Sequence, residues 1–337
     1  MNAHPVDLAS RALGGSVPWA TDEFFAEKER LVQPGPAAAH PEFGPRGKVY
    51  DGWETRRRRP RATADDADRV IVRLGASGVV ERLVVDTAHF TGNYPPLVSV
   101  DATTVDGHPA LADVLAAPWQ PLLPPSPAAG DRENSYPLAD PRRWTHLRLA
   151  IHPDGGVARL RAYGRVLPDP RLLTTTVDLA AIGNGAVVED CSNRFYSDPT
   201  HLLLPGRARS MGEGWETARR RDDGHDWVLV RLGLPGTCEQ VVVDTTHFLG
   251  NAPDAVEVTG RVAGTDDWVP VLPPTPVQPD QRHRLPVAAG PELSHVRVAI
   301  HPDGGFARLR VLGTVSAARR RAALAEWQTT GGTGGPA

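Results

Sequence analysis

The sequence has very little cysteine and no long apolar run. Only two cysteines occur among its 337 residues, Cys191 and Cys238, and both lie in the second half of the chain. Their placement excludes a disulfide framework repeated along the chain, and their spacing is not that of a zinc site, so we expect two reduced thiols. The apolar runs, such as residues 241–243, are far shorter than the ~20 residues of a membrane-spanning helix. We therefore expect no transmembrane segment and no membrane partner.

An excess of charge of one sign is also missing. The chain has 37 Lys and Arg residues against 40 Asp and Glu residues, a formal net charge of -3. Nucleic-acid-binding proteins need a basic surface to neutralise phosphates, and here only two short arginine runs, residues 56–59 and 219–221, are basic. Residues 1–10 lack the apolar segment of a secretory signal. We therefore expect a cytoplasmic protein with no nucleic-acid partner.

Several common catalytic motifs are absent as well. There is no glycine-rich phosphate loop, no dinucleotide fingerprint, no nucleophile elbow and no paired-histidine metal motif. These absences give a covalent serine or cysteine mechanism no support. No cofactor is identified and no metal ligand is assigned, although Asp and His are plentiful and a divalent ion held by several loops remains an alternative.

The most informative feature present is an internal duplication. Six blocks recur in the same order, and the first of them aligns without a gap. The matching pairs are residues 7–35 and 178–206, 52–55 and 214–217, 84–90 and 242–248, 92–93 and 250–251, 119–125 and 268–274, and 151–156 and 300–305. The offset between matching blocks shrinks along the chain, so the first copy carries extra loop residues. We predict one domain over residues 1–168, a second over 177–316, and a short helix with a disordered tail over 317–337.

Within each copy the apolar residues alternate with other residues, which is the period of a half-buried strand. Examples are residues 147–151 and 296–300, and the same pattern predicts strands at 70–74, 83–87, 97–100 and 158–163. Short strands with abundant glycine and proline favour an antiparallel sandwich over βαβ units. We predict an all-β protein of two tandem jelly-roll β-sandwiches. Helix is expected only near residues 22–30 and over 317–327, and disorder over 329–337.

The first candidate site is the block Gly-Trp-Glu-Thr with an arginine two residues later. It supplies Trp53, Glu54 and Arg57 in the first copy and Trp215, Glu216 and Arg219 in the second. A guanidinium can hold a carboxylate by two parallel hydrogen bonds, and a partly desolvated Glu can act as a general acid or base. An alternative is that this block is an ion-paired loop that only closes the sandwich.

The second candidate site follows a strand that ends in a turn. It contains His89 and Asn93 in the first copy and His247 and Asn251 in the second. A loop histidine can move protons near neutral pH, and an amide can both donate to and accept from a ligand. The structural alternative is that the histidine bonds the turn while the asparagine supplies its left-handed backbone conformation.

The third block, His-Pro-Asp-Gly-Gly at residues 152–156 and 301–305, is typical of a tight hairpin turn. His152 and His301, which precede the two turns, are weaker site candidates.

Three blocks, residues 51–57, 86–96 and 151–156, resemble the allantoicase family in order and in both copies. The resemblance covers nearly the whole chain. It implies a repeated jelly-roll domain similar to galactose-binding modules, and the hydrolysis of allantoate to ureidoglycolate and urea in purine degradation. It also implies a small-molecule substrate and a homo-oligomer. The copies differ, for example where Asp51 and Arg56 become Glu213 and Ala218, so their equal activity is doubtful.

Allantoate carries one carboxylate and two ureido groups on one carbon, which suggests roles for the candidate residues. We predict that the acid and base roles fall to Glu54, His89, Glu216 and His247. The predicted substrate-binding residues are Trp53, Arg57, Asn93, Trp215, Arg219 and Asn251. Three other functions stay open: a non-catalytic sugar-binding or small-ligand module, a related enzyme acting on ureidoglycolate or another ureide, and a structural interaction protein.

Overall fold

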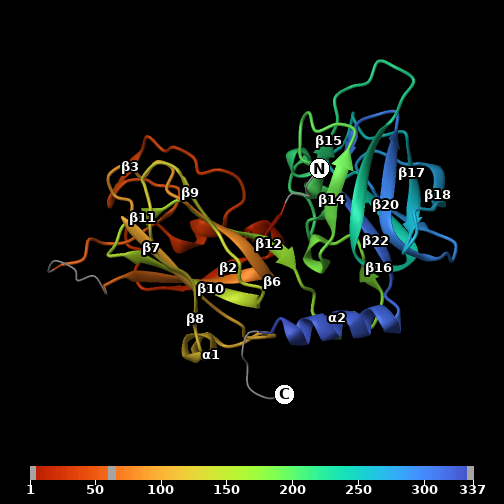
Figure 1. Cartoon of the computed structure of the whole chain (residues 1–337). Coiled ribbons are helices and arrows are strands. Elements are labelled where there is room, and N and C mark those ends of the chain that lie inside the picture. The colour runs from red at the N-terminus through yellow and green to blue at the C-terminus, as the bar shows by residue number, and fades with distance from the viewer. Residues whose placement is uncertain (1–4, 60–65, 332–337) are drawn as a thin grey trace. The chain divides into compact units, whose positions relative to one another are not determined.

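The computed structural model describes residues 5–59 and 66–331. These residues form two compact units, one of residues 5–167 with 328–331 and the other of residues 168–327. Both units are built mainly of antiparallel strands (Figure 1). The predicted all-β class, with two tandem jelly-roll sandwiches, is confirmed.

Eight strands of the first unit form one hydrogen-bonded system with the order β1-β12-β6-β10-β7-β8, and β2 and β9 also pair with β6. The strands are β1 (Val6–Asp7), β2 (Ser16–Ala20), β6 (Asp68–Asp86), β7 (Leu97–Thr103), β8 (Gln120–Pro127), β9 (Glu133–Pro137), β10 (Arg143–His152) and β12 (Arg159–Val166). Two small ribbons lie outside it: β5 (Trp53–Glu54) with β11 (Gly156–Val157), and β3 (Phe43–Gly44) with β4 (Gly47–Lys48).

Strand β6 connects the two layers of the first sandwich. Around Ile71 its neighbours are β2 and β10, whereas around Val85 they are β9 and β12. The sequence predicted two separate strands here, at 70–74 and 83–87, and that division was wrong. The glycines between them do not form a turn; at Gly78 the backbone of Arg165 passes so close that a Cβ atom would collide with it.

The second unit repeats this topology in the order β13-β22-β16-β20-β17-β18, with β14 and β19 also paired to β16. Its strands are β13 (Val177–Asp178), β14 (Val187–Cys191), β15 (Trp215–Glu216), β16 (Asp226–Asp244), β17 (Ala255–Val262), β18 (Trp268–Pro276), β19 (Arg282–Pro286), β20 (Glu292–His301), β21 (Gly305–Phe306) and β22 (Arg308–Thr314). Because β16 bridges its sandwich as β6 does, the strands of the eight-stranded system in one copy have structural counterparts in the other.

The core follows the predicted alternation. In β10, Leu147, Leu149 and Ile151 are fully buried, and in β20 Val296 and Val298 are fully buried too. Burying one such side chain stabilises the fold by about 1.5–3 kcal/mol relative to leaving it in water. Each sandwich therefore has an apolar interior.

Helices are few, and the predictions for them were only partly right. The tail helix is confirmed as α2 (Ala317–Thr329), while α1 (Leu111–Ala116) was not predicted. The expected helix at 22–30 was wrong: Asp22 accepts from the N–H of Phe24 and Glu23 accepts from that of Lys28, which favours turns. Only a 3₁₀ helix, η2 (Lys28–Val32), follows. The other 3₁₀ helices are η1 (Arg11–Leu13), η3 (Pro170–Leu172), η4 (Ile182–Asn184), η5 (Pro199–Leu203) and η6 (Met211–Glu213).

The predicted disorder at 329–337 was wrong for its described part. Thr329 ends α2, the carbonyl of Thr330 accepts from the N–H of Arg143 at 2.7 Å, and Gly331 forms a β-bridge to Arg143. Residues 332–337 lie outside the described residues.

Candidate functional site

The three candidate blocks of the first copy lie side by side. Ribbon strand β5 pairs with β11 so that Glu54 faces Gly156, and the N–H of Thr55 donates to the carbonyl of Gly155 at 3.0 Å. The N–H of Gly156 donates to the carbonyl of Asn93 at 2.7 Å. Backbone hydrogen bonds therefore join all three blocks into one site.

Two glycines of the third block allow this close assembly. Gly155 has a φ of 141°, which side-chain-bearing residues rarely adopt. A Cβ atom on Gly156 would overlap the buried ring of Phe90. The turn predicted at Pro-Asp-Gly is thus present, and it also holds the second block against the first.

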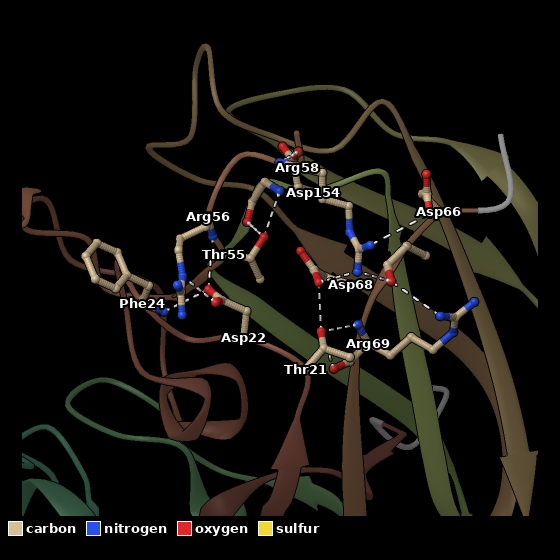
Figure 2. A network of polar contacts seen from close by, with 12 residues as sticks. Thr21, Asp22, Phe24, Thr55, Arg56, Arg58, Asp66, Asp68, Arg69 and Asp154 are labelled. Atoms are coloured by element: carbon tan, nitrogen blue, oxygen red, sulfur yellow. Dashed lines mark hydrogen bonds and ion pairs between the residues drawn. The ribbon is translucent and has the colours of Figure 1, made fainter. Parts of the chain in front are cut away.

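The arginine run of the first block is held by two anchors. Arg56 donates from Nε to Asp22 Oδ2 at 2.7 Å, and Arg58 donates from Nη2 to the buried Asp68 at 2.8 Å. The N–H of Arg58 also donates to Asp154 of the third block, at 2.7 Å. Figure 2 shows the side chain of Arg56 directed toward Asp22 and that of Arg58 directed toward Asp68. Arg57, which lies between the two anchors, has no ion pair with any carboxylate in the described part of the chain.

A cavity of about 1010 Å³ opens over the joined blocks. Residues that line it and bear on its chemistry are Arg46, Lys48, Tyr50, Glu54, Arg57 and Asn93. Arg58, Arg59 and Asp154 also contribute to its wall. Since positive side chains outnumber carboxylates here, the cavity suits a small anionic ligand.

Glu54 and Asn93 form the central polar pair of the cavity. Asn93 Nδ2 donates to Glu54 Oε1 at 2.8 Å. Burial raises the pKa of the Glu54 carboxyl above its ordinary value of 4.5, although the Asn93 hydrogen bond and the charge of Arg57 oppose this rise. Asn93 Oδ1 is buried and has no hydrogen-bond partner among the described residues. The pair therefore offers a carboxyl suited to proton transfer and an acceptor available to a ligand N–H.

Trp53 and Trp215 lie outside the cavity in their own core. Both indoles are fully buried, and their Nε1 atoms donate to the carbonyls of Asp22 and Asn193 at 2.7 and 2.9 Å. Their predicted contact with a substrate has no support in this arrangement, because each ring is fully buried and its Nε1 atom is already bonded to a backbone carbonyl.

Neither of the two loop histidines lines this cavity. His89 and His247 adopt φ values of 70° and 75°, so the histidine, and not the asparagine, takes the left-handed conformation of the turn. Their Nε2 atoms lie 3.2 and 3.1 Å from the carbonyls of Ala37 and Ala208. Since a carbonyl only accepts, each ring donates there. The structure thus favours the turn-bonding alternative for both histidines.

Sequence reasoning missed part of the cavity wall. Arg46, Lys48 and Tyr50 come from residues 36–51, a segment of sixteen residues where the second copy has only the seven residues 207–213. The shrinking offset between repeats marked this insertion, but nothing in the sequence placed it over Glu54.

The second copy keeps the polar pair and the anchor. Asn251 Nδ2 donates to Glu216 Oε1 at 2.7 Å, and Arg220 bonds Asp226 and Asp303 as Arg58 bonds Asp68 and Asp154. Arg219 occupies the position of Arg57. Beside Asn251, however, the sulfur of Met211 lies 3.1 Å from Nδ2. The surroundings of the duplicated pair are therefore different.

Within residues 5–59 and 66–331 no helix is long and apolar enough to cross a membrane. In the same ranges no three His, Cys, Asp or Glu side chains are grouped to hold a metal ion.

The sequence model of the Allantoicase repeat matches residues 6–167 and again residues 177–316. The chain belongs to the allantoicase family. A probable allantoicase of Nocardia farcinica is 55% identical over 312 residues, covering 91% of this chain and 93% of that protein. One from Streptomyces avermitilis is 45% identical over 337 residues, covering 97% of this chain and 90% of the relative.

Solved allantoicase structures share the fold. The crystal structure of allantoicase from Saccharomyces cerevisiae superposes with a TM-score of 0.78 at 34% identity, over 91% of this chain and 92% of the yeast chain. A further allantoicase structure gives a TM-score of 0.76 at 34% identity, over 92% and 93% of the two chains. The resemblance to allantoicase stated from the sequence is confirmed.

Proposed function

We propose that the chain hydrolyses allantoate to ureidoglycolate and urea, and that the cavity of the first copy is where it does so. The observation that carries this proposal is the Glu54–Asn93 pair beside Arg57, in a basic cavity of an allantoicase-family chain. The substrate is small and anionic, and it has several N–H donors, as this site requires.

The charges of the cavity match the substrate carboxylate. Arg57 is not paired to a carboxylate of the described residues, so its guanidinium is available for a bidentate contact. Arg46 and Lys48 add positive charge along the same cavity. Asn93 Oδ1, buried and lacking a partner, accepts from a ureido N–H in this proposal.

The reaction breaks the bond between the central carbon and one ureido nitrogen. Urea leaves with a proton on that nitrogen, and a hydroxyl derived from water takes its place on the carbon. We assign both proton transfers to Glu54, which takes a proton from water and supplies one to the leaving group. Burial moves the pKa of Glu54 toward neutral pH, and a carboxyl with such a pKa takes up and releases protons more readily there.

His89 acts as a positioning residue in this proposal. Its ring bonds the carbonyl of Ala37, at the start of the segment that carries Arg46 and Lys48. The second copy has no segment of equal length, so we assign catalysis to the first copy. A homo-oligomeric state and a cytoplasmic location stay predictions, to be checked by light scattering and by cell fractionation.

The experiment that tests the function is urea release from allantoate by the purified full-length protein, with ureidoglycolate measured in parallel. Equal amounts of both products support the proposal. No product with or without added divalent metal overturns it and favours a binding module, whereas turnover of ureidoglycolate alone indicates the related ureide reaction. A chelator-treated sample shows in addition whether the reaction needs a metal ion.

A further inference from the structure

A second cavity lies in the second copy, away from the Glu216–Asn251 pair. It has a volume of about 190 Å³, several times the ~30 Å³ that one water occupies in the liquid. Its charged lining residues are Arg207, Arg282, Arg308, Arg310 and Asp244. Four guanidinium groups thus share a small space with one carboxylate.

The sheet itself gathers these side chains. On β16, Asp244 lies between Arg282 of β19 and Arg308 of β22, and Arg310 follows two residues along β22. Residues opposite one another on neighbouring strands, and residues two apart, point to the same face. Arg207, from the loop after η5, completes the lining.

Most of this positive charge is not neutralised internally. Arg310 pairs with Asp178 at 3.4 Å, and its two Nη atoms donate to backbone carbonyls, so its N–H groups are already used. No ion pair to a described carboxylate is formed by Arg207, Arg282 or Arg308. Arg308 is only 5% exposed, and its Nε is buried without a hydrogen-bond partner. Burial and the neighbouring charge of Arg310 lower the pKa of Arg308. A ligand of opposite charge would relieve this repulsion.

The first copy supplies an internal comparison. Its matching cavity, of about 340 Å³, is lined by Asp7, Asp86, Glu133 and Arg161, so carboxylates predominate. Glu133 stands opposite Asp86 where Arg282 stands opposite Asp244, and Pro36 takes the place of Arg207. The same sandwich therefore folds without either arginine, and packing does not require them.

The two copies also differ in whether the buried arginine of this cavity region has a carboxylate partner. In the first copy Arg159, the counterpart of Arg308, donates to Asp51 Oδ2 at 2.6 Å. In the second copy the corresponding Glu213 turns its carboxylate to Arg209, at 2.6 Å from Nε, and gives Arg308 only its backbone carbonyl. The buried guanidinium has thereby lost its internal carboxylate partner.

We propose that the cavity lined by Arg207, Arg282, Arg308 and Arg310 binds a small dianionic oxyanion of the phosphate type. A tetrahedral oxyanion accepts from guanidinium groups arriving from different directions, here Arg207, Arg282 and Arg308, whereas a carboxylate offers two oxygens in one plane. Arg310, whose Nη atoms already bond backbone carbonyls, contributes its charge. This site is separate from the cavity of the first copy, so its occupation does not depend on the reaction proposed there.

The test is calorimetric titration of the full chain with inorganic phosphate, in buffers matched for ionic strength with chloride. We compare the wild type with the double variant Arg207→Ala, Arg282→Ser and with the control Arg284→Ser. Arg284 lies on the same strand but outside the cavity, and Ser135 is its counterpart in the first copy. Glycerol 3-phosphate, titrated in parallel, distinguishes a phosphate ester from the free ion as the preferred ligand.

We expect the double variant to weaken phosphate binding at least about tenfold, because charge-assisted hydrogen bonds are lost, while Arg284→Ser leaves it unchanged. Phosphate heat no greater than that of chloride in the wild type overturns the proposal, as does equal weakening in both variants. Both arginines are exposed, so the variants should fold, which a thermal melt verifies. If the double variant does not fold, Arg282→Glu, which reproduces the residue of the first copy, replaces it.

Discussion

Glu54 and Asn93 are joined by a hydrogen bond of 2.8 Å from the side-chain amide to the carboxylate, although thirty-nine positions separate them in the chain. The second copy contains the same bond between Asn251 and Glu216, at 2.7 Å. The two pairs differ in what surrounds them, since Arg46 and Lys48 line the cavity only beside the first. A duplicated pair in unequal surroundings allows each copy to serve as the control for the other.

The replacement Glu54→Gln should abolish most of the turnover of allantoate. A glutamine keeps the shape and the hydrogen bond but cannot transfer a proton, so kcat should fall by about 10²- to 10⁴-fold. The matched variant Glu216→Gln should retain most of the wild-type kcat. Steady-state urea release measures both. Equal losses in the two variants would show that both copies catalyse the reaction.

The replacement Arg57→Ala should mainly weaken substrate binding. Loss of a charge-assisted contact to the substrate carboxylate should raise KM by about 10- to 100-fold. Arg56→Ala is the matched control, because Arg56 is directed to Asp22 and the second copy has Ala218 there (Figure 2). A KM unchanged in Arg57→Ala, or raised equally in Arg56→Ala, would contradict the assignment.

Much of the fold was accessible from the sequence because strand periodicity and duplication are local or repeated signals. The alternation in β10 and β20 predicted their buried faces, and the block order predicted two equivalent sandwiches. The continuity of β6 was not accessible, since Gly75 and Gly78 resemble turn residues until the close approach of the backbone at Leu13 and at Arg165 is known. A glycine within a strand can mark the close approach of another backbone segment as well as a turn of the chain.

The sequence named several residues that line the cavity, but not its whole wall. Glu54, Arg57 and Asn93, which the sequence singled out in two separate blocks, line one cavity, and their chemical roles stay predictions. Trp53 and His89 belong to the same motifs, but the indole of Trp53 is fully buried in the core and the ring of His89 bonds the carbonyl of Ala37. A sequence motif shows which residues are close in the chain, whereas the backbone conformation determines which of their side chains line the cavity.

The acid side of the pH–rate profile should report the Glu54 carboxylate. As a base it must be ionised, so kcat/KM should fall as the pH decreases through its raised pKa. The hydrogen bond from Asn93 stabilises the ionised form, and therefore Asn93→Ala should raise that pKa and move the acid limb to higher pH. Asn251→Ala should leave the limb in place. A limb at the same pH in all three proteins would exclude Glu54 as the titrating group.

The replacement Asp51→Asn should destabilise the protein by about 3 kcal/mol at neutral pH, because it leaves the buried guanidinium of Arg159 without a carboxylate partner. Asp101→Asn is the matched control: Asp101 pairs with Arg148 at 2.7 Å, but both side chains are about one-third exposed, and such pairs contribute about 0–1 kcal/mol. Urea unfolding followed by tryptophan fluorescence compares the two. Equal losses of unfolding free energy in both variants would contradict the stronger stabilisation that we assign to the Asp51–Arg159 pair.

The pH dependence of this loss follows from the pKa of Asp51. Burial alone would raise that pKa, but hydrogen bonds from Arg159 and from the N–H of Ala38 outweigh it and lower the pKa from 3.8 to about 2. A carboxyl whose pKa is lower in the folded state than in the unfolded state stabilises the fold fully above pH 3.8, and this contribution disappears as the pH falls toward about 2. The difference in unfolding free energy between the wild type and Asp51→Asn should therefore be constant from pH 7 to about pH 5 and narrow below pH 3.8. A difference that does not narrow would show that the aspartate stabilises the loop by shape and not by charge.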